Sequence, residues 1–209
     1  MDVGDISSLS ILVPFSLGLI SYARLDYFQK VFWYFIGFTA AFEGLVFYFV
    51  TRQWNTFGLF DVFLLIDLLF FAWLFYKHLA FPRWLIYLTL FITLFTVVTG
   101  TALIFTHMST KIQLLYYMVL FFFFLIQSGF VIISMADQVD INPVKHYLFW
   151  LAFARLFYFL IVIFIYAYSY LDPDSYENKS YAVAFGIINS AGNIICNSMY
   201  GVALVCRKV

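Results

Sequence analysis

The chain has 209 residues, of which 65% are hydrophobic and 24% aromatic, while only 11% are charged. A soluble domain carries about 45–50% apolar and about 25% charged residues, so this composition excludes an ordinary water-soluble fold and indicates a protein embedded in lipid. Eleven basic and eleven acidic residues cancel to a net charge of zero, which argues against a nucleic-acid partner and leaves the lipid bilayer as the expected surroundings.

Seven stretches are long and apolar enough to cross a bilayer as helices, since about 20 apolar residues span ~30 Å of hydrocarbon. The predicted spans are 9–24, 31–50, 58–76, 84–106, 112–136, 147–171 and 181–206. Only short connectors remain, so we predict one heptahelical transmembrane domain, residues 1–209, of the all-α integral membrane class. Asp2 and Asp5 precede the first stretch without any basic residue, unlike a signal peptide, and this stretch is expected to be a retained helix.

Basic residues in the connectors predict the orientation of the spans. The side with the N-terminus and the connectors 51–57, 107–111 and 172–180 holds three basic residues, whereas the other side holds seven. The three are Arg52, Lys111 and Lys179, and the seven are Arg24, Lys30, Lys77, Arg83, Lys145, Arg207 and Lys208. Because short cytoplasmic loops are enriched in Lys and Arg, the N-terminus is predicted outside and the C-terminus inside. The glycosylation sequon at Asn178 falls on the predicted outer side, and its use stays open.

Four ionisable residues lie within the predicted spans: Glu43, Asp61, Asp67 and Arg155. Each costs about 2.5–3.5 kcal/mol on insertion scales, so such residues normally face the bundle interior and find partners. At about 1.5 Å per helical residue, Asp67 and Arg155 lie about 15 Å from the predicted inner edge, and Glu43 about 20 Å. We therefore expect Arg155 to form an ion pair with Asp67 or Glu43 inside the bundle.

The span 181–206 carries a second polar pattern. Asn189, Asn193 and Asn197 recur at i, i+4 and i+8, which places them along one helix face. Amides on such a face either join helices through hydrogen bonds or line a ligand cavity, and both interpretations stay open. Gly192 and Gly201 nearby favour close helix packing.

Two further features are expected to be structural. Thr89, Thr93 and Thr96 form a stripe on the span 84–106, where their hydroxyls can bond their own helix backbone. Gly44, next to Glu43, is expected to permit the close approach of a neighbouring helix.

Motifs of the common membrane enzymes are missing. The histidines His78, His107 and His146 lie at segment ends, and no H-E-x-x-H or mid-membrane His/Cys set occurs, so no metal site is predicted. No G-x-S-x-G motif is present either. No cofactor is predicted and an enzyme is not favoured, although a lipid enzyme that works through two carboxylates stays open.

The helix count and the outside N-terminus are shared with rhodopsins and heptahelical receptors, but a retinal-binding rhodopsin needs a lysine on its seventh helix and residues 181–206 contain none. The segment Tyr34 to Tyr48, with Glu43 in it, and the Phe60-Asp61 start of the third span resemble small uncharacterised bacterial heptahelical proteins. These look like the sensor halves of signalling proteins. The resemblance implies a sensor-like module in the bacterial inner (plasma) membrane and implies no particular ligand or activity.

A receptor-like or sensor module is the leading functional prediction, with one outward-facing pocket for a small polar ligand. The residues expected to line this pocket are Glu43, Asp61, Asp67, Arg155, Asn189 and Asn193. The alternatives are a secondary transporter or ion or proton pathway that uses the buried carboxylates, and a structural membrane subunit. Expected partners are the bilayer, the ligand, and a membrane signalling protein or a second copy of the chain.

Overall fold

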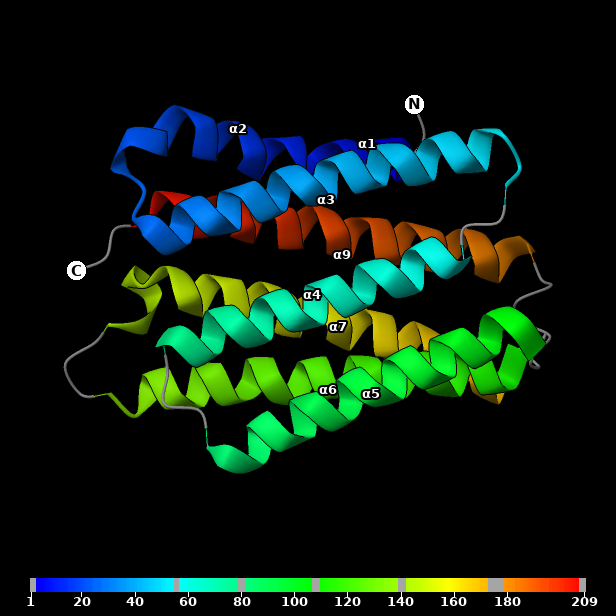
Figure 1. The fold of residues 1–209 in the computed structure, drawn as a ribbon. Coiled ribbons are helices and arrows are strands. Elements are labelled where there is room, and N and C mark those ends of the chain that lie inside the picture. Colours follow the sequence, from blue (N-terminus) through cyan, green and yellow to red (C-terminus); the bar gives the residue numbers. More distant parts are fainter. Residues whose placement is uncertain are drawn as a thin grey trace.

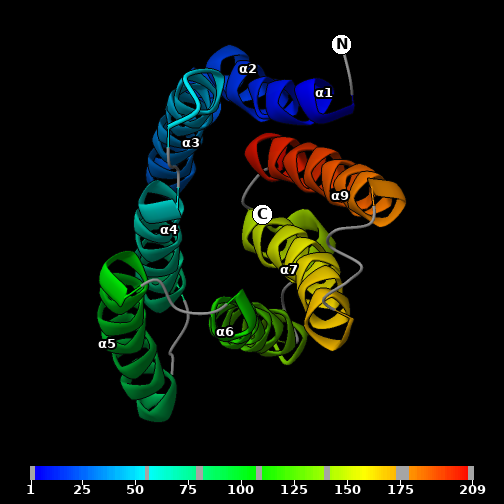
Figure 2. The same cartoon turned by 90° about the vertical axis from the view of Figure 1, so that its right-hand side faces the viewer.

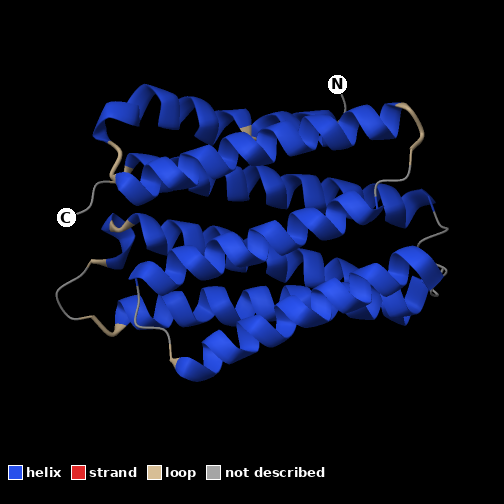
Figure 3. Ribbon diagram, in the orientation of Figure 1, coloured by secondary structure: helices blue, strands red, loops and turns tan. Residues whose placement is uncertain are grey.

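The computed structural model describes residues 3–54, 57–78, 82–106, 110–138, 142–172 and 179–206, which form helices joined by short turns, without a strand in these ranges (Figures 1 and 3). The sequon residue Asn178 lies outside them. The helices are α1 (Val3–Ser10), α2 (Leu12–Ser21), α3 (Tyr27–Thr51), α4 (Phe57–His78), α5 (Arg83–Thr106), α6 (Thr110–Ala136), α7 (Tyr147–Leu171) and α9 (Lys179–Val205). Two 3-10 helices, η1 (Tyr22–Arg24) and η2 (Pro143–Lys145), complete the described elements.

Seven stretches of these helices are long and apolar enough to cross a membrane, as the sequence predicted. They are Ile6–Arg24, Tyr27–Thr51, Gly58–Lys77, Arg83–Ala102, Thr110–Ala136, Tyr147–Leu171 and Ser180–Val205. The all-helical class and the number of seven candidate spans are therefore confirmed for the described residues, and the composition fits a multi-pass membrane protein.

The helices form two rows when the bundle is viewed along its length (Figure 2). One curved row contains α1 and α2, then α3, α4 and α5, and the second row contains α9, α7 and α6. The rows meet at both edges, because α1 and α2 pack on α9 and α5 packs on α6. We call the end where α1, α4 and α9 begin the N-terminal end of the bundle.

The first span differs from the single helix predicted over 9–24, since it begins earlier and is broken at Ile11. Pro14 explains the break: proline has no backbone N–H, and its ring crowds the carbonyl four residues before it, which belongs to Ser10. The last residue of α1 is Ser10. A single proline therefore divides the span into α1 and α2.

The second span begins at Tyr27, four residues before the predicted start at 31, because a capping box extends it. The Asp26 carboxylate accepts a hydrogen bond from the Gln29 backbone N–H at 2.8 Å, and the Gln29 side chain accepts one from the Asp26 backbone N–H at 3.2 Å. Gln29 Nε2 also donates to the carbonyl oxygens of Ala203 and Cys206, at 3.0 and 2.8 Å. One glutamine thus starts α3 and ties it to the C-terminal end of α9.

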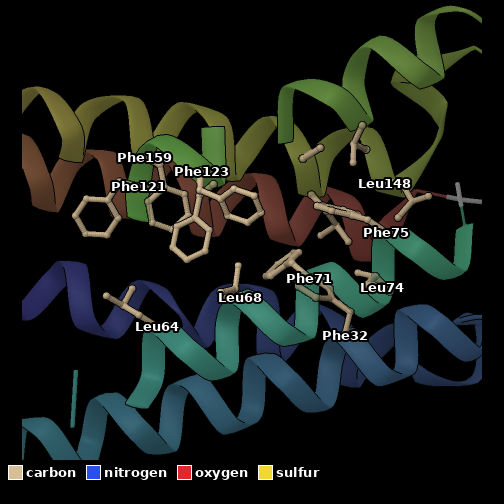
Figure 4. Packing of buried hydrophobic residues seen from close by; sticks show 14 of the residues in the cluster. Phe32, Leu64, Leu68, Phe71, Leu74, Phe75, Phe121, Phe123, Leu148 and Phe159 are labelled. Atoms are coloured by element: carbon tan, nitrogen blue, oxygen red, sulfur yellow. The ribbon is translucent and has the colours of Figure 1, made fainter. Parts of the chain in front are cut away.

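Aromatic and aliphatic side chains fill the space between the two rows. Figure 4 shows Leu68 and Phe71 of α4 extending toward Phe121 of α6 and Phe159 of α7. Leu68 and Phe71 are 0% exposed. Since lipid is as apolar as these side chains, close packing rather than exclusion of water holds this core together.

Two glycines allow close helix contacts. A Cβ atom at Gly18 of α2 would overlap the Trp33 ring of α3, whose Nε1 donates to the Phe15 carbonyl oxygen at 2.8 Å. A Cβ atom at Gly201 of α9 would lie 2.9 Å from Leu17 Cδ1 of α2. Gly44 was expected to play the same part, and this prediction is wrong: a Cβ atom there would meet no described atom within 4 Å.

The threonine stripe on α5 is structural, as predicted. The hydroxyl groups of Thr89, Thr93 and Thr96 each donate to the backbone carbonyl four residues earlier, at 2.8 Å in every case. These hydroxyls are used within their own helix.

Candidate functional site

The predicted ion pair joins the two rows. Arg155 Nη1 of α7 lies 2.6 Å from Asp67 Oδ2 of α4, and the Arg155 residue is 1% exposed. Of the two carboxylates predicted as partners, Asp67 is therefore the correct one. The pair neutralises both charges inside the apolar core, which relieves much of their burial penalty.

Aromatic rings surround the Arg155 guanidinium. Its central carbon lies 3.8 Å from the centre of the Phe71 ring, 4.8 Å from Phe124 and 5.2 Å from Phe159. Arg155 Nε and Nη2 are buried and have no hydrogen-bond partner, so the attraction between the cation and these rings supplies the remaining stabilisation. The buried ion pair therefore connects α4 with α7 and stabilises their packing.

Asp61 lies nearer the N-terminal end of α4 and contacts α5 and α6 instead. Its Oδ1 accepts a hydrogen bond from the Tyr117 hydroxyl at 3.0 Å, and a Cβ atom at Gly100 would lie 3.6 Å from its Oδ2. Asp61 and Asp67 are six residues apart, which is about 120° around a helix of 3.6 residues per turn. The two carboxylates of α4 therefore have separate surroundings.

Glu43 of α3 is half-buried, and its Oε2 atom is buried without a hydrogen-bond partner. Its carboxylate lies close enough to Tyr158 of α7 for an electrostatic interaction. Neither Glu43 nor Asp61 forms an ion pair with any basic residue that the structure describes. Since the charges of Arg155 and Asp67 neutralise each other, Glu43 and Asp61 are the ionisable groups of the four that have no ion-pair partner among the described residues.

Two of the α9 amides connect helices. Asn193 Nδ2 donates to the Ser7 hydroxyl of α1 at 3.0 Å, and Asn197 Nδ2 donates to the Ser10 hydroxyl at 2.7 Å. The Ser10 hydroxyl in turn donates to the Ser7 carbonyl oxygen at 2.6 Å. For Asn193 and Asn197 the structure thus favours the helix-joining interpretation, and the bonds lie beside the break at Ile11.

Asn189 has different surroundings, for a geometric reason. Each step of four residues turns about 40° past a full helical turn, so Asn189 and Asn197 differ by about 80°. Asn193 and Asn197 face α1, whereas Asn189 faces α7, where its side chain lies within hydrogen-bonding reach of Tyr158.

A partly open cavity of about 350 Å³ lies between α7 and α9, in the half of the bundle toward its N-terminal end. Its walls come from three helices, with four aromatic rings among the side chains. The lining residues are Phe60 of α4, Tyr158, Val162, Ile165 and Tyr166 of α7, and Ala182, Phe185, Gly186 and Asn189 of α9. This volume is within the range of about 300–1,000 Å³ typical of small-molecule sites.

Of the six residues predicted to line one pocket, Asn189 lines this cavity. Asp61 follows the lining residue Phe60 in the chain, and Glu43 interacts electrostatically with the lining residue Tyr158. Asp67, Arg155 and Asn193 have their partners elsewhere. The structure therefore places Asn189 in the cavity wall and Asp61 beside a lining residue, and it does not bring all six residues into one pocket.

Sequence reasoning missed the aromatic part of the cavity. Tyr158 and Tyr166 belong to an aromatic-rich segment, and Phe185 to an apolar one, and in both segments lining residues and packing residues have the same composition. Hydroxyl groups at mid-span, as in Tyr158, are the one signal that could have marked them, because a buried phenol seeks a hydrogen-bond partner.

A second group of polar atoms is buried in α6. Gln127 and Ser128 are both 0% exposed, and the side-chain nitrogen and oxygen of Gln127 and the Ser128 hydroxyl have no hydrogen-bond partner. No group of three or more His, Cys, Asp or Glu side chains in the described ranges is arranged to hold a metal ion.

Comparisons with known proteins give no match. No family model matches the chain, and no curated protein and no solved structure shows significant similarity to it. The resemblance to bacterial sensor-like heptahelical proteins stays a prediction.

Proposed function

We propose that the protein is a receptor-like or sensor module of a membrane, which binds a small molecule in the cavity between α7 and α9. The observation that carries this proposal is the cavity itself. Mostly apolar walls with a few hydrogen-bonding groups, here the Asn189 amide and the Tyr158 and Tyr166 hydroxyls, are typical of small-molecule sites.

The cavity is placed to affect helix packing. It lies between α7 and α9, and at its edge the two helices are in close contact, where a Cβ atom at Gly192 would lie 3.0 Å from Ile161 Cδ1 and 3.8 Å from the ring of the lining residue Tyr158. A ligand that fits one spacing of the two helices better than another shifts the population toward that spacing. α9 would pass such a change to α1 and α2, which pack on it.

The basic residues support an outer location for the cavity. With the N-terminus outside, as the positive-inside rule favours, the N-terminal end of the bundle faces the exterior. In a bacterial cell this corresponds to the periplasmic side of the inner membrane, so the module would sense a molecule outside the cytoplasm. A membrane signalling protein or a second copy of the chain would then receive the signal.

Filling the cavity tests the proposal. Gly186 lines the cavity and a Cβ atom there would meet no described atom within 4 Å, so the side chain of Gly186→Leu starts in open space and is expected to fill part of the cavity. Ala191→Leu, at an exposed position of the same helix, is the matched control. In a thermal-shift screen of neutral, cationic and anionic small molecules, compounds that raise the Tm of the wild type and of Ala191→Leu should not raise that of Gly186→Leu. Stabilisation that Gly186→Leu leaves unchanged would place binding elsewhere.

A secondary transporter is the second candidate, favoured by the break in the first span at Ile11. Discontinuous helices with polar side chains at mid-membrane are typical of transporter sites, and here Asn193 and Asn197 reach Ser7 and Ser10 at the break. Uptake of a cavity ligand into proteoliposomes, lost in Asn197→Ala, would favour transport over sensing. Binding without uptake would favour the sensor.

A further inference from the structure

We propose that the ligand of the α7 and α9 cavity is a small organic cation, such as an amine or a quaternary ammonium compound. This inference rests on the proposed function and goes further, because it assigns the charge and the chemical class of the ligand. Two independent features of the site support it: the aromatic rings in its walls and two carboxylates that adjoin or act on lining residues.

The first feature is the aromatic lining. Four of the lining side chains carry rings, Phe60, Tyr158, Tyr166 and Phe185, and they come from three different helices. The face of an aromatic ring attracts a cation electrostatically, and sites built from several rings are the characteristic means of binding quaternary ammonium groups. The Asn189 amide adds one polar contact for a substituent such as a hydroxyl.

The second feature is the pair of carboxyl groups outside the ring of aromatics. Glu43 interacts electrostatically with Tyr158, and its Oε2 is buried without a hydrogen-bond partner. Asp61 follows Phe60 in the chain and accepts a hydrogen bond from the Tyr117 hydroxyl. The Tyr117 ring in turn lies 5.7 Å from the ring of the lining residue Tyr166. Asp61 thus adjoins one lining residue in the chain, and Glu43 acts on another, Tyr158, through space.

Among the residues that line the cavity, none carries a positive charge. The lining residues include no Lys, Arg or His, and Arg155 is already paired with Asp67. Charges in a low-dielectric interior act over longer distances than in water, so the two carboxyl groups in their ionised form favour a cation in the cavity over a neutral molecule of the same shape. An anion would be rejected.

The experiment compares a cation with its uncharged isostere. Binding of choline, tetramethylammonium and benzyltrimethylammonium is measured on the full chain in lipid nanodiscs, beside 3,3-dimethyl-1-butanol, which replaces the choline nitrogen by carbon. The charge variants are Glu43→Gln and Asp61→Asn, and the control is Asp137→Asn, which removes an exposed carboxylate beyond the far end of α6. Circular dichroism and gel filtration check that each variant is folded.

At least one of the three cations should bind, and its Kd should be at least about tenfold lower than that of the isostere. Glu43→Gln or Asp61→Asn should raise this Kd about tenfold, Gly186→Leu should abolish binding, and Asp137→Asn should change nothing. Equal binding of the isostere and choline, with both lost in Gly186→Leu, would overturn the charge assignment and leave the proposed function standing. Failure of all three cations to bind, or cation binding that neither charge variant weakens, would also overturn the inference.

Discussion

Arg155 is stabilised by two kinds of contact, an ion pair and the faces of aromatic rings. The Asp67 carboxylate lies 2.6 Å from one nitrogen, and the Phe71 ring lies 3.8 Å from the central carbon. Arginine suits this position better than lysine would, since its planar group binds a carboxylate at the edge and a ring at the face.

Removing Arg155 should strongly destabilise the protein. Arg155→Met leaves Asp67 buried without a counterion, which costs about 3–5 kcal/mol, whereas an exposed pair would cost under about 1 kcal/mol. The double variant Arg155→Met/Asp67→Asn should lose much less than the sum of the two single variants. Unfolding free energies in mixed detergent micelles measure both effects, and additive losses would contradict the direct contact.

The α9 amides should separate into two classes on substitution. Asn197→Ala removes the 2.7 Å bond to Ser10 and should lower stability by about 1 kcal/mol, within the range measured for hydrogen bonds between membrane helices. It should also speed hydrogen exchange in α1. The hydrogen bonds that α9 amides donate to α1 come from Asn193 and Asn197, so Asn189→Ala should leave hydrogen exchange in α1 unchanged. Equal effects of the two variants would show that the amides share one role.

The sequence was sufficient to predict that Arg155 pairs with Asp67 or Glu43, because the depths of opposite charges in long helices can be counted from their ends, but it did not decide between the two carboxylates. The sequence was insufficient to predict that Asn189 faces a different helix from Asn193 and Asn197, since a spacing of four residues keeps side chains on one helix face only over a short length. The lining of the cavity could not be predicted either, because its walls depend on how α4, α7 and α9 pack. Aromatic residues also serve lipid contact, packing and ligand binding alike.

At the scale of elements, Gly18 and Gly44 should respond in opposite ways to the same change. Gly18→Ala forces Trp33 away from α2 and should cost about 1–3 kcal/mol by overpacking. Gly44→Ala adds a methyl group in open space and should be neutral or stabilising by up to about 1 kcal/mol, since alanine favours a helix over glycine.

Unfolding in mixed micelles measures this difference, and the Trp33 displacement gives a second readout through tryptophan fluorescence. A destabilising Gly44→Ala would indicate a helix contact at that position after all.

Helix positions were more predictable than helix ends. The span 147–171 coincides with α7, but α3 begins earlier than predicted because the Asp26 and Gln29 capping box lies outside the apolar run that defined the span. The break at Ile11 was likewise not predicted, although Pro14 is visible in the sequence, since hydropathy counts the length of a span and not its hydrogen bonds.

At the scale of the whole molecule, the orientation can be tested directly. In a background of Cys196→Ala and Cys206→Ser, a membrane-impermeant maleimide should label Asp5→Cys in spheroplasts. Lys145→Cys should react only after permeabilisation, because the positive-inside rule places it in the cytoplasm. The reverse pattern would move the α7 and α9 cavity to the cytoplasmic side.

The packing of α1 and α2 on α9 also constrains how the protein is made. The chain between Arg24 and Val205 must be synthesised before this contact is complete, which takes roughly 10–40 s at about 5–20 residues per second. During that interval the first span resides in the bilayer with α3 as its main neighbour, and Ser7 and Ser10 lack the amides of Asn193 and Asn197. Biogenesis therefore has a late closing step, and a nascent chain stalled before α9 would present its first helix to quality-control proteases.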